Sequence, residues 1–343
     1  EVEETIAAGR WRHADTGAMT PAALIAELDS WSPIAREWIA KALAEKIGDF
    51  IPGLVTMLKS DRPEARAGAC AALGYQGEKA AAAVPLIAAA LEDEPIVAIS
   101  ASYALARISK PAAKVLPEML KAVLAREEEG LMRPTQQAMA FGLGYAPGRV
   151  APLYFDGLLP GLAQDGNPLD GLDREILYPA IGKLLKDPGG RTRGCGAYAL
   201  THFSRDDLAA MAQEVYDAVR NPAVHYLMFD DQARQYALDL MLKYRIAEGV
   251  PLCVESMELH RWGQGMRLPH RIATLQGYGG HAKSALPMLR ELHEQKKKDE
   301  TTSKALAEAI QVIENDNDPA PLVSLHTLVD ERLARDLGMV EDD

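Results

Sequence analysis

The stretch HRWGQGMRLPHR, residues 260–271, concentrates side chains that bind carboxylates and phosphates in an otherwise acidic chain. The formal net charge of the 343 residues is −12, yet residues 259–290 contain no Asp or Glu. Three arginines could form a forked cluster for an anion, beside the flat apolar ring of Trp262. Because Arg and Trp are enriched in protein interfaces, we predict contact with a protein partner that has an acidic surface. The predicted contact residues are Arg261, Trp262, Arg267, His270 and Arg271.

The same stretch also has a purely structural interpretation. Its arginines could pair with nearby acids such as Glu255 and Glu258, while Trp262 fills the gap between neighbouring helices. The stretch follows a helix that Pro251 is predicted to open, and Pro269 is expected to begin the next one. We therefore expect it to form a loop between the two helices.

A second cluster of the same composition stands near the start of the chain. It consists of Arg10, Trp11, Arg12 and His13. If the intervening helices stack about 10 Å apart, the two clusters lie tens of ångströms from each other. The chain begins EVEETIAAGR without a methionine, which is consistent with a piece of a longer protein. An alternative role for the Arg10–His13 cluster is therefore docking onto whatever precedes residue 1.

Motifs of known enzyme classes are absent from the sequence. There is no HExxH, no GxSxG, no Walker loop and no dinucleotide-binding glycine run. The cysteines at 70, 195 and 253 form no CxxC pair, and the eight histidines show no ligand spacing. We therefore expect no catalytic residues, no metal, no cofactor and no small-molecule substrate.

Charge and hydropathy restrict the possible partners. Residues 299–343 hold 12 acids against Lys304, Arg332 and Arg335, a net charge of −9. A chain this acidic is a poor general binder of nucleic acid, which requires a basic face. No uninterrupted apolar run of about 20 residues exists, so we predict no membrane-spanning helix.

The elements that must position the two clusters repeat along the chain. Residues 51–73 (IPGLVTMLKSDRPEARAGACAAL) align without gaps with residues 178–200 (YPAIGKLLKDPGGRTRGCGAYAL), and residues 84–105 follow the same scheme with one residue fewer. A proline opens a first helix, apolar residues recur at three- and four-residue spacing, and a short turn leads to an Ala-rich second helix. The pattern predicts helical hairpins ending at Leu43, Leu73, Leu105, Leu143, Leu200, Leu238 and Leu275. The prolines predicted to open first helices are Pro52, Pro85, Pro117, Pro152, Pro251 and Pro287, and the alignment gives Pro179 the same place as Pro52.

Aromatic residues stand two positions before four of these leucines, at Tyr103, Phe141, Tyr198 and Tyr236. We interpret them as core packing rather than as a ligand-binding ladder. Hairpins of 30–40 residues cannot bury their apolar faces alone, but a row of them forms a continuous core. The predicted fold class is therefore all-α, an α-solenoid of about seven hairpins.

Residues 33–298 resemble the HEAT-repeat family, in particular the short bacterial HEAT-like repeats also seen in phycobilin-lyase-type proteins. The resemblance rests on the Ala-Leu endings, the helix-opening prolines, the Asp/Pro turns and the arginines at 66 and 193. It implies an armadillo-like, right-handed superhelix. We expect an irregular segment and capping helix over residues 1–32, and acidic capping helices over residues 299–343.

The resemblance implies a non-catalytic scaffold that binds a protein partner through its concave face and inter-repeat loops. An iron site of the deoxyhypusine-hydroxylase kind requires repeated His-Glu pairs, and the sequence has only His293-Glu294. A groove of the DNA-glycosylase kind requires a cationic face, which the net charge argues against. Two alternatives stay open: an accessory domain of a larger multidomain enzyme, and an anion- or nucleic-acid-binding solenoid.

Overall fold

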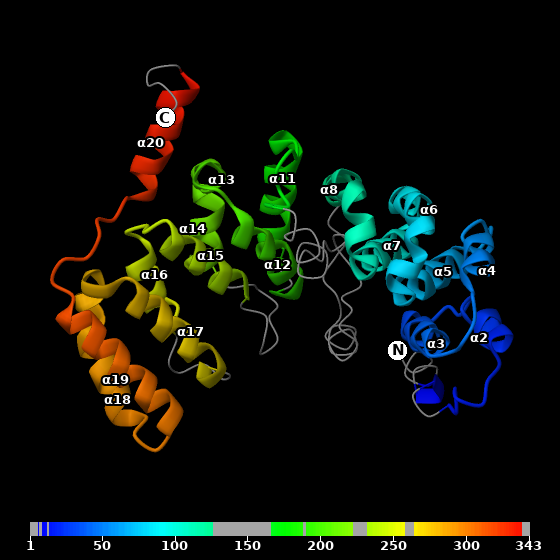
Figure 1. Cartoon of the computed structure of the whole chain (residues 1–343), viewed down its shortest axis with the longest axis horizontal. Helices are drawn as coiled ribbons and strands as arrows, with labels where there is room; N and C mark the ends of the chain where they lie inside the picture. Colours follow the sequence, from blue (N-terminus) through cyan, green and yellow to red (C-terminus); the bar gives the residue numbers. More distant parts are fainter. Residues whose placement is uncertain are drawn as a thin grey trace. The chain divides into compact units, whose positions relative to one another are not determined.

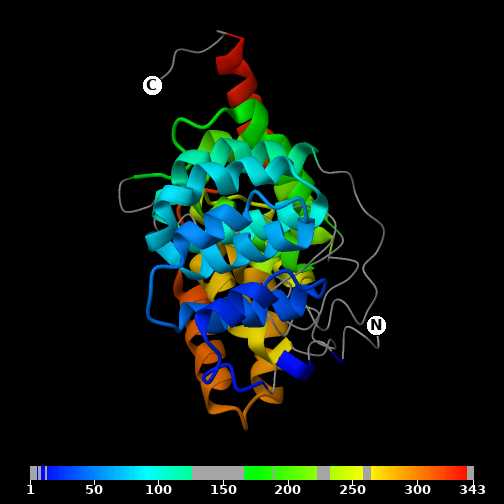
Figure 2. The same ribbon diagram turned by 90° about the vertical axis from the view of Figure 1, so that its right-hand side faces the viewer.

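The chain divides into two compact units, Glu1–Asp187 and Pro188–Asp343. The computed structural model (Figures 1 and 2) describes residues 6, 9–11, 14–125, 166–187, 190–221, 232–257 and 264–337. Regular secondary structure within these ranges is helical, apart from one backbone bridge between Ile246 and Val323. Both units are built on the solenoid plan of stacked helical hairpins, in which the first helix is termed A and the second B.

Unit 1 contains three described hairpins, α2/α3, α4/α5 and α6/α7, whose B helices α3, α5 and α7 pack one on the next (Figure 1). The A helix α8 follows, and α11 packs against it. The helices of unit 1 are α2 (Pro21–Glu27), α3 (Pro33–Ala44), α4 (Ile51–Met57), α5 (Pro63–Tyr75), α6 (Val84–Ala89), α7 (Pro95–Ile108), α8 (Leu116–Ala125) and α11 (Arg174–Leu185).

Unit 2 continues the same scheme with the B helices α12, α15, α17 and α19, which also pack in order. The hairpin α18/α19 extends the series to Asn315, and the last helix, α20, packs against α13. The helices of unit 2 are α12 (Gly190–Ala197), α13 (Arg205–Ala210), α14 (Ala212–Arg220), α15 (Gln232–Lys243), α16 (Gly249–Glu255), α17 (Gln264–Gly277), α18 (Leu286–Gln295), α19 (Glu300–Asn315) and α20 (Leu325–Asp336).

The leucines that end the predicted hairpins lie at the centre of the core. Six of them are described, and each is 0% exposed: Leu43, Leu73, Leu105, Leu200, Leu238 and Leu275. Of the aromatic residues two positions earlier, Tyr103 is buried, and the rings of Tyr198 and Tyr236 meet edge to face with centroids 5.5 Å apart. Burial confirms the packing interpretation for Tyr103, whereas Tyr198 and Tyr236 are only half-buried. Leu143 and Phe141 lie outside the described residues.

Most of the predicted helix-opening prolines stand in the first turn of an A helix, where the missing N–H costs nothing. They are Pro52, Pro85, Pro117, Pro251 and Pro287. Pro152 lies outside the described residues. The prediction for Pro179 is wrong: α11 begins five residues earlier at Arg174, because the Asp173 carboxylate accepts a hydrogen bond of 2.9 Å from the Glu175 N–H and caps the helix there.

Small residues let the B helices of unit 1 approach closely. A β-carbon at Gly68 would lie 2.0 Å from the carbonyl oxygen of Leu28, and one at Gly74 would lie 2.7 Å from the Cα of Ala104. Gly68 thus brings α5 against the turn between α2 and α3, and Gly74 brings it against α7. The Ala/Gly-rich composition of α5 therefore serves backbone-to-backbone packing.

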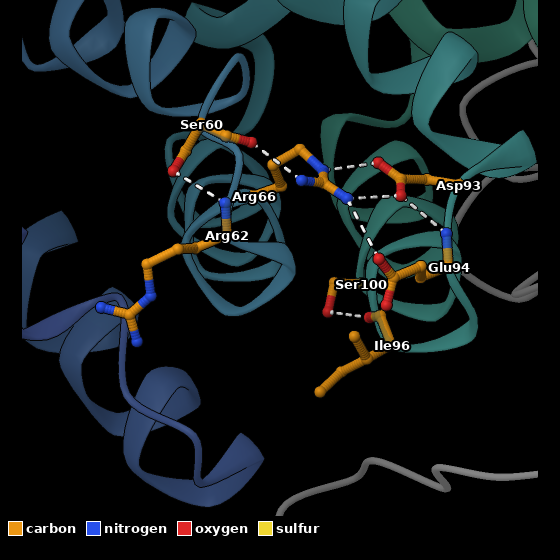
Figure 3. A network of polar contacts seen from close by, with 7 residues as sticks. All are labelled: Ser60, Arg62, Arg66, Asp93, Glu94, Ile96 and Ser100. Carbon is orange, nitrogen blue, oxygen red and sulfur yellow. Dashed lines mark hydrogen bonds and ion pairs between the residues drawn. The ribbon is translucent and has the colours of Figure 1, made fainter.

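The arginines that align in the repeat tie each hairpin to the next. Arg66 on α5 donates from Nε and Nη2 to the two carboxylate oxygens of Asp93, both at 2.7 Å, and from Nη1 to the carbonyl of Ser60 at 2.8 Å (Figure 3). Ser60 lies in the A–B turn of the same hairpin and Asp93 in the A–B turn of the following one. Arg193 on α12 likewise donates to the carbonyls of Asn221 and Ala218, at the end of α14.

Residues 316–324, here called the strap, run back from α19 over two earlier turns of unit 2. The Asp316 carboxylate accepts a hydrogen bond of 2.8 Å from the Gly280 N–H, after α17. Val323 exchanges backbone hydrogen bonds of 3.0 and 2.9 Å with Arg245 and Ala247, after α15. The Glu248 carboxylate then accepts from the Leu325 N–H at 3.1 Å, where α20 begins. The strap thereby brings α20 into contact with α13.

Candidate functional site

Helix α17 carries the described part of residues 260–271. It begins at Gln264 and contains Pro269 in its interior, so the loop predicted for this stretch is wrong from residue 264 onward. The helix extends this far because Leu268, Ile272 and Leu275, at helical spacing, are all buried on one face. Arg261 and Trp262 lie outside the described residues.

The structure separates the three remaining predicted contact residues. His270 is exposed, Arg267 is half-buried, and Arg271 is only 2% exposed. The Arg271 guanidinium donates from Nη1 to the amide oxygen of Gln235 on α15. The backbone carbonyl of Arg271 accepts a hydrogen bond of 3.4 Å from the Cys253 thiol. The prediction that Arg271 belongs to an outward surface is therefore corrected: its side chain joins α17 to α15.

The N-terminal cluster divides in a similar way. Trp11 is 5% exposed and packs in the interior, so its assignment to an exposed cluster is also corrected. The Arg10 guanidinium lies 5.6 Å from the Trp11 ring centroid and 3.9 Å from the Glu27 carboxylate, with most of its side chain exposed. Arg12 and His13 lie outside the described residues.

Helices α15 and α17 pack side by side and carry the predicted residues Arg267 and His270 together with polar side chains of α15. Positions 236, 239 and 243 share a face of α15 because they are three and four residues apart, and positions 267 and 270 do so on α17. The charges of His270 and Arg271 act on the Asp239 carboxylate across the two helices. We call this set the α15–α17 surface: Tyr236, Asp239, Lys243, Arg267 and His270.

Two titrating groups show the electrostatics of this region. Partial burial raises the pKa of Asp239, while a hydrogen bond of 2.6 Å from the Gln235 amide and the charges of His270 and Arg271 act in the opposite direction. Burial lowers the pKa of His202, beside Tyr198, and the charge of Lys243 lowers it further. The named set holds two cations, Lys243 and Arg267, and one carboxylate, Asp239, so the α15–α17 surface is positive in an acidic chain. The Lys243 ammonium also donates a hydrogen bond of 3.1 Å to the carbonyl of Phe203.

Asp239 and Lys243 were not among the residues predicted from the sequence. The signal for them was present, since they continue the face of α15 that begins at Tyr236, the aromatic position of the repeat. Clusters of residues that are close along the chain do not reveal this surface, because it is assembled from two B helices.

A second polar cluster joins the three B helices of unit 1. The Glu37 carboxylate on α3 accepts hydrogen bonds from the Tyr75 hydroxyl at 2.7 Å and from the Arg107 guanidinium of α7. Arg107 also lies over the Tyr75 ring, 4.1 Å from its centroid. Burial and the Glu37 charge raise the pKa of Tyr75, so the phenol stays protonated as a donor. These contacts link α3, α5 and α7, so the cluster is a joint between repeats.

Two free cysteines occur among the described residues. Cys70 and Cys253 are buried, and burial raises the pKa of each thiol to about 12, which keeps them protonated. Within the described ranges, no three His, Cys, Asp or Glu side chains come together as metal ligands. None of the helices described there is long and apolar enough to span a bilayer.

A comparison with known protein families matches part of unit 1. Residues 21–106, from α2 through most of α7, match a family model described as HEAT repeats. The match begins at α2, which pairs with α3 as the A helix of the first hairpin. A search of curated proteins found none that matches the chain.

Proposed function

We propose that this chain, which carries HEAT repeats, is a non-catalytic scaffold that binds a protein partner with an acidic surface. HEAT repeats are in general protein-interaction scaffolds. Stacked hairpins suit that role because they present a long surface that local contacts alone hold in shape.

The observation that carries the proposal is the α15–α17 surface. Lys243 and His270 are exposed and Arg267 is half-exposed, on helices whose opposite faces are fixed in the core by Leu238 and Leu275. A partner would therefore meet positive side chains on a pre-ordered backbone, which limits the conformational entropy lost on binding. Arg261 and Trp262 stay in the proposed contact set on sequence grounds, whereas Arg271 and Trp11 leave it because they are buried.

A charge-reversal experiment tests this assignment. Affinity capture with the wild-type chain is compared with capture by the Lys243→Glu, Arg267→Glu double variant and by Lys298→Glu. Lys298 is an exposed lysine in the turn before α19, outside the α15–α17 surface. Lys298→Glu therefore makes the same kind of charge reversal at a different place. We expect a directly bound protein that the wild type and Lys298→Glu retain and the double variant loses, with retention that decreases as salt is added.

Equal recovery of every partner by all three chains would overturn the site assignment. Thermal unfolding of each variant establishes that the fold is intact. Retention that nuclease treatment abolishes would instead favour the alternative of a nucleic-acid-binding solenoid.

A further inference from the structure

Helix α20 packs on unit 2 through one face only. Leu325 and Leu328 are buried against the unit, and Leu328 is 2% exposed. On the same side, the Glu331 carboxylate accepts a hydrogen bond of 2.7 Å from Arg205, and Arg335 pairs with Asp206. Arg205 and Asp206 open α13, so these two ion pairs fix which face of α20 is inward. The rest of α20 stands out from unit 2 in both views (Figures 1 and 2).

The outward face of α20 carries an apolar stripe. Val329, Leu333 and Leu337 are four residues apart, which aligns them along one side of the helix. Their exposed fractions are 39%, 54% and 65%, so exposure increases toward the end of the helix. Single exposed aliphatic residues are ordinary on protein surfaces, but a continuous row opposite a docked face indicates a further contact.

Carboxylates border this stripe on both sides. At 100° per residue, Asp330 lies on one side of the row and Asp336 on the other, with side chains 62% and 60% exposed. His326 lies 2.8 Å from Asp330, and Arg332 lies 3.7 Å from Asp336. The surrounding segment 299–343 has a net charge of −9.

We propose that the α20 stripe, Val329, Leu333 and Leu337, binds an amphipathic helix of a partner protein whose apolar face is bordered by Lys or Arg. Aliphatic side chains at a four-residue spacing accept the apolar ridge of a second helix. The two flanking aspartates select basic borders by charge complementarity. This site goes beyond the proposed scaffold function, because its charge is opposite to that of the α15–α17 surface.

Two other occupants fit the stripe less well. A second copy of α20 packed antiparallel about Leu333 would place Asp330 of one copy opposite Asp336 of the other, and like charges repel. An anionic membrane surface is disfavoured because the same aspartates would face its negative headgroups.

Synthetic helices provide the probe. A Leu/Lys amphipathic helix and its Leu/Glu counterpart are titrated by fluorescence anisotropy against the full chain and two variants. The test variant is Leu333→Ser, Leu337→Ser. The matched control is Leu86→Ser, at an exposed aliphatic position on α6 in unit 1. We expect the Lys helix to bind the wild type and the control equally, to bind the test variant about tenfold more weakly or worse, and the Glu helix not to bind.

A third variant, Asp330→Asn, Asp336→Asn, tests the charge argument. It should weaken binding of the Lys helix and reduce the salt dependence of that binding. Thermal unfolding confirms that every variant is folded. Equal affinity of the Lys helix for wild type and the test variant would overturn the proposal, as would binding of the Glu helix.

Two further results would overturn the proposal by showing that something else binds the α20 stripe. One is a wild-type dimer in sedimentation that the test variant loses, which identifies a second copy. The other is binding of phosphatidylcholine or phosphatidylglycerol vesicles that depends on Leu333 and Leu337.

Discussion

The hydroxyl of Tyr278 lies directly over Gly249 and donates a hydrogen bond of 2.9 Å to the carbonyl oxygen of Ile246. A β-carbon at Gly249 would stand 1.9 Å from that hydroxyl oxygen. Tyr278 follows the last residue of α17 and Gly249 begins α16, so this contact sets how the two helices of one hairpin meet. The Tyr278 side chain is buried, and water therefore offers its hydroxyl no replacement partner.

Gly249→Ala should destabilise the chain by about 1–3 kcal/mol, because the added methyl group displaces the Tyr278 hydroxyl from its acceptor. The measurement is urea unfolding followed by circular dichroism. Gly53→Ala on α4 is the matched control, since nothing lies within 4 Å of its β-carbon position. At that exposed helical site alanine should stabilise by up to about 1 kcal/mol. The same loss in both variants would contradict the packing argument.

Arg66→Ala should cost about 2 kcal/mol of stability, because it removes two charge-assisted hydrogen bonds to Asp93 and one to the Ser60 carbonyl, all partly buried. Arg62→Ala removes an exposed ion pair with Asp29 and should cost less than about 1 kcal/mol. Thermal or urea unfolding of the two variants measures the difference. A larger loss of stability in Arg62→Ala than in Arg66→Ala would contradict the role of the Arg66–Asp93 contact in joining the two hairpins.

Substitutions at two adjacent positions of α17, 270 and 271, should differ in their effect on the free energy of unfolding. Arg271→Met removes the buried donor to Gln235 and should lower stability by about 1–2 kcal/mol. His270→Ala changes an exposed side chain and should leave the unfolding midpoint nearly unchanged, within about 0.5 kcal/mol. Equal and small effects of both substitutions would place Arg271 at the surface after all.

His202 should make stability depend on pH in the weakly acidic range. Burial lowers its pKa in the folded chain from 6.5, so the unfolded chain binds a proton more readily. The folded state is therefore favoured above pH 6.5 and loses stability as the pH falls below that value. Unfolding midpoints measured from pH 7.5 downward should decline less steeply in His202→Gln than in the wild type. Parallel profiles for the two chains would exclude this assignment.

The hairpins could be predicted because residues within each hairpin indicate which of its faces is buried. The recurring leucines, the opening prolines and the small residues of the B helices specify which face is buried, and the six described leucines are indeed fully buried. The start of α17 differs from the prediction because a proline usually stands in the first turn of a helix, whereas the burial of Leu268 extends α17 beyond Pro269 toward its N-terminus.

The candidate site was predicted only in part, since a polar residue type says little about the direction of its side chain. Arg271 precedes the buried Leu275 by four residues and so shares its face. Spacing from the buried leucine would have placed it inside, as it does Arg234, four residues before Leu238. The partners of Arg271 on α15, and the ion pairs between α13 and α20, join segments that no local pattern relates.

The strap changes how the C-terminal end of the chain should melt. In a row of repeats held only by nearest neighbours, the outermost one frays first. Here the backbone bridge between Ile246 and Val323 fastens the segment after the last hairpin to a turn two hairpins earlier. Opening that end must also break this bridge and release α20 from α13, so the last three hairpins should unfold as one cooperative block.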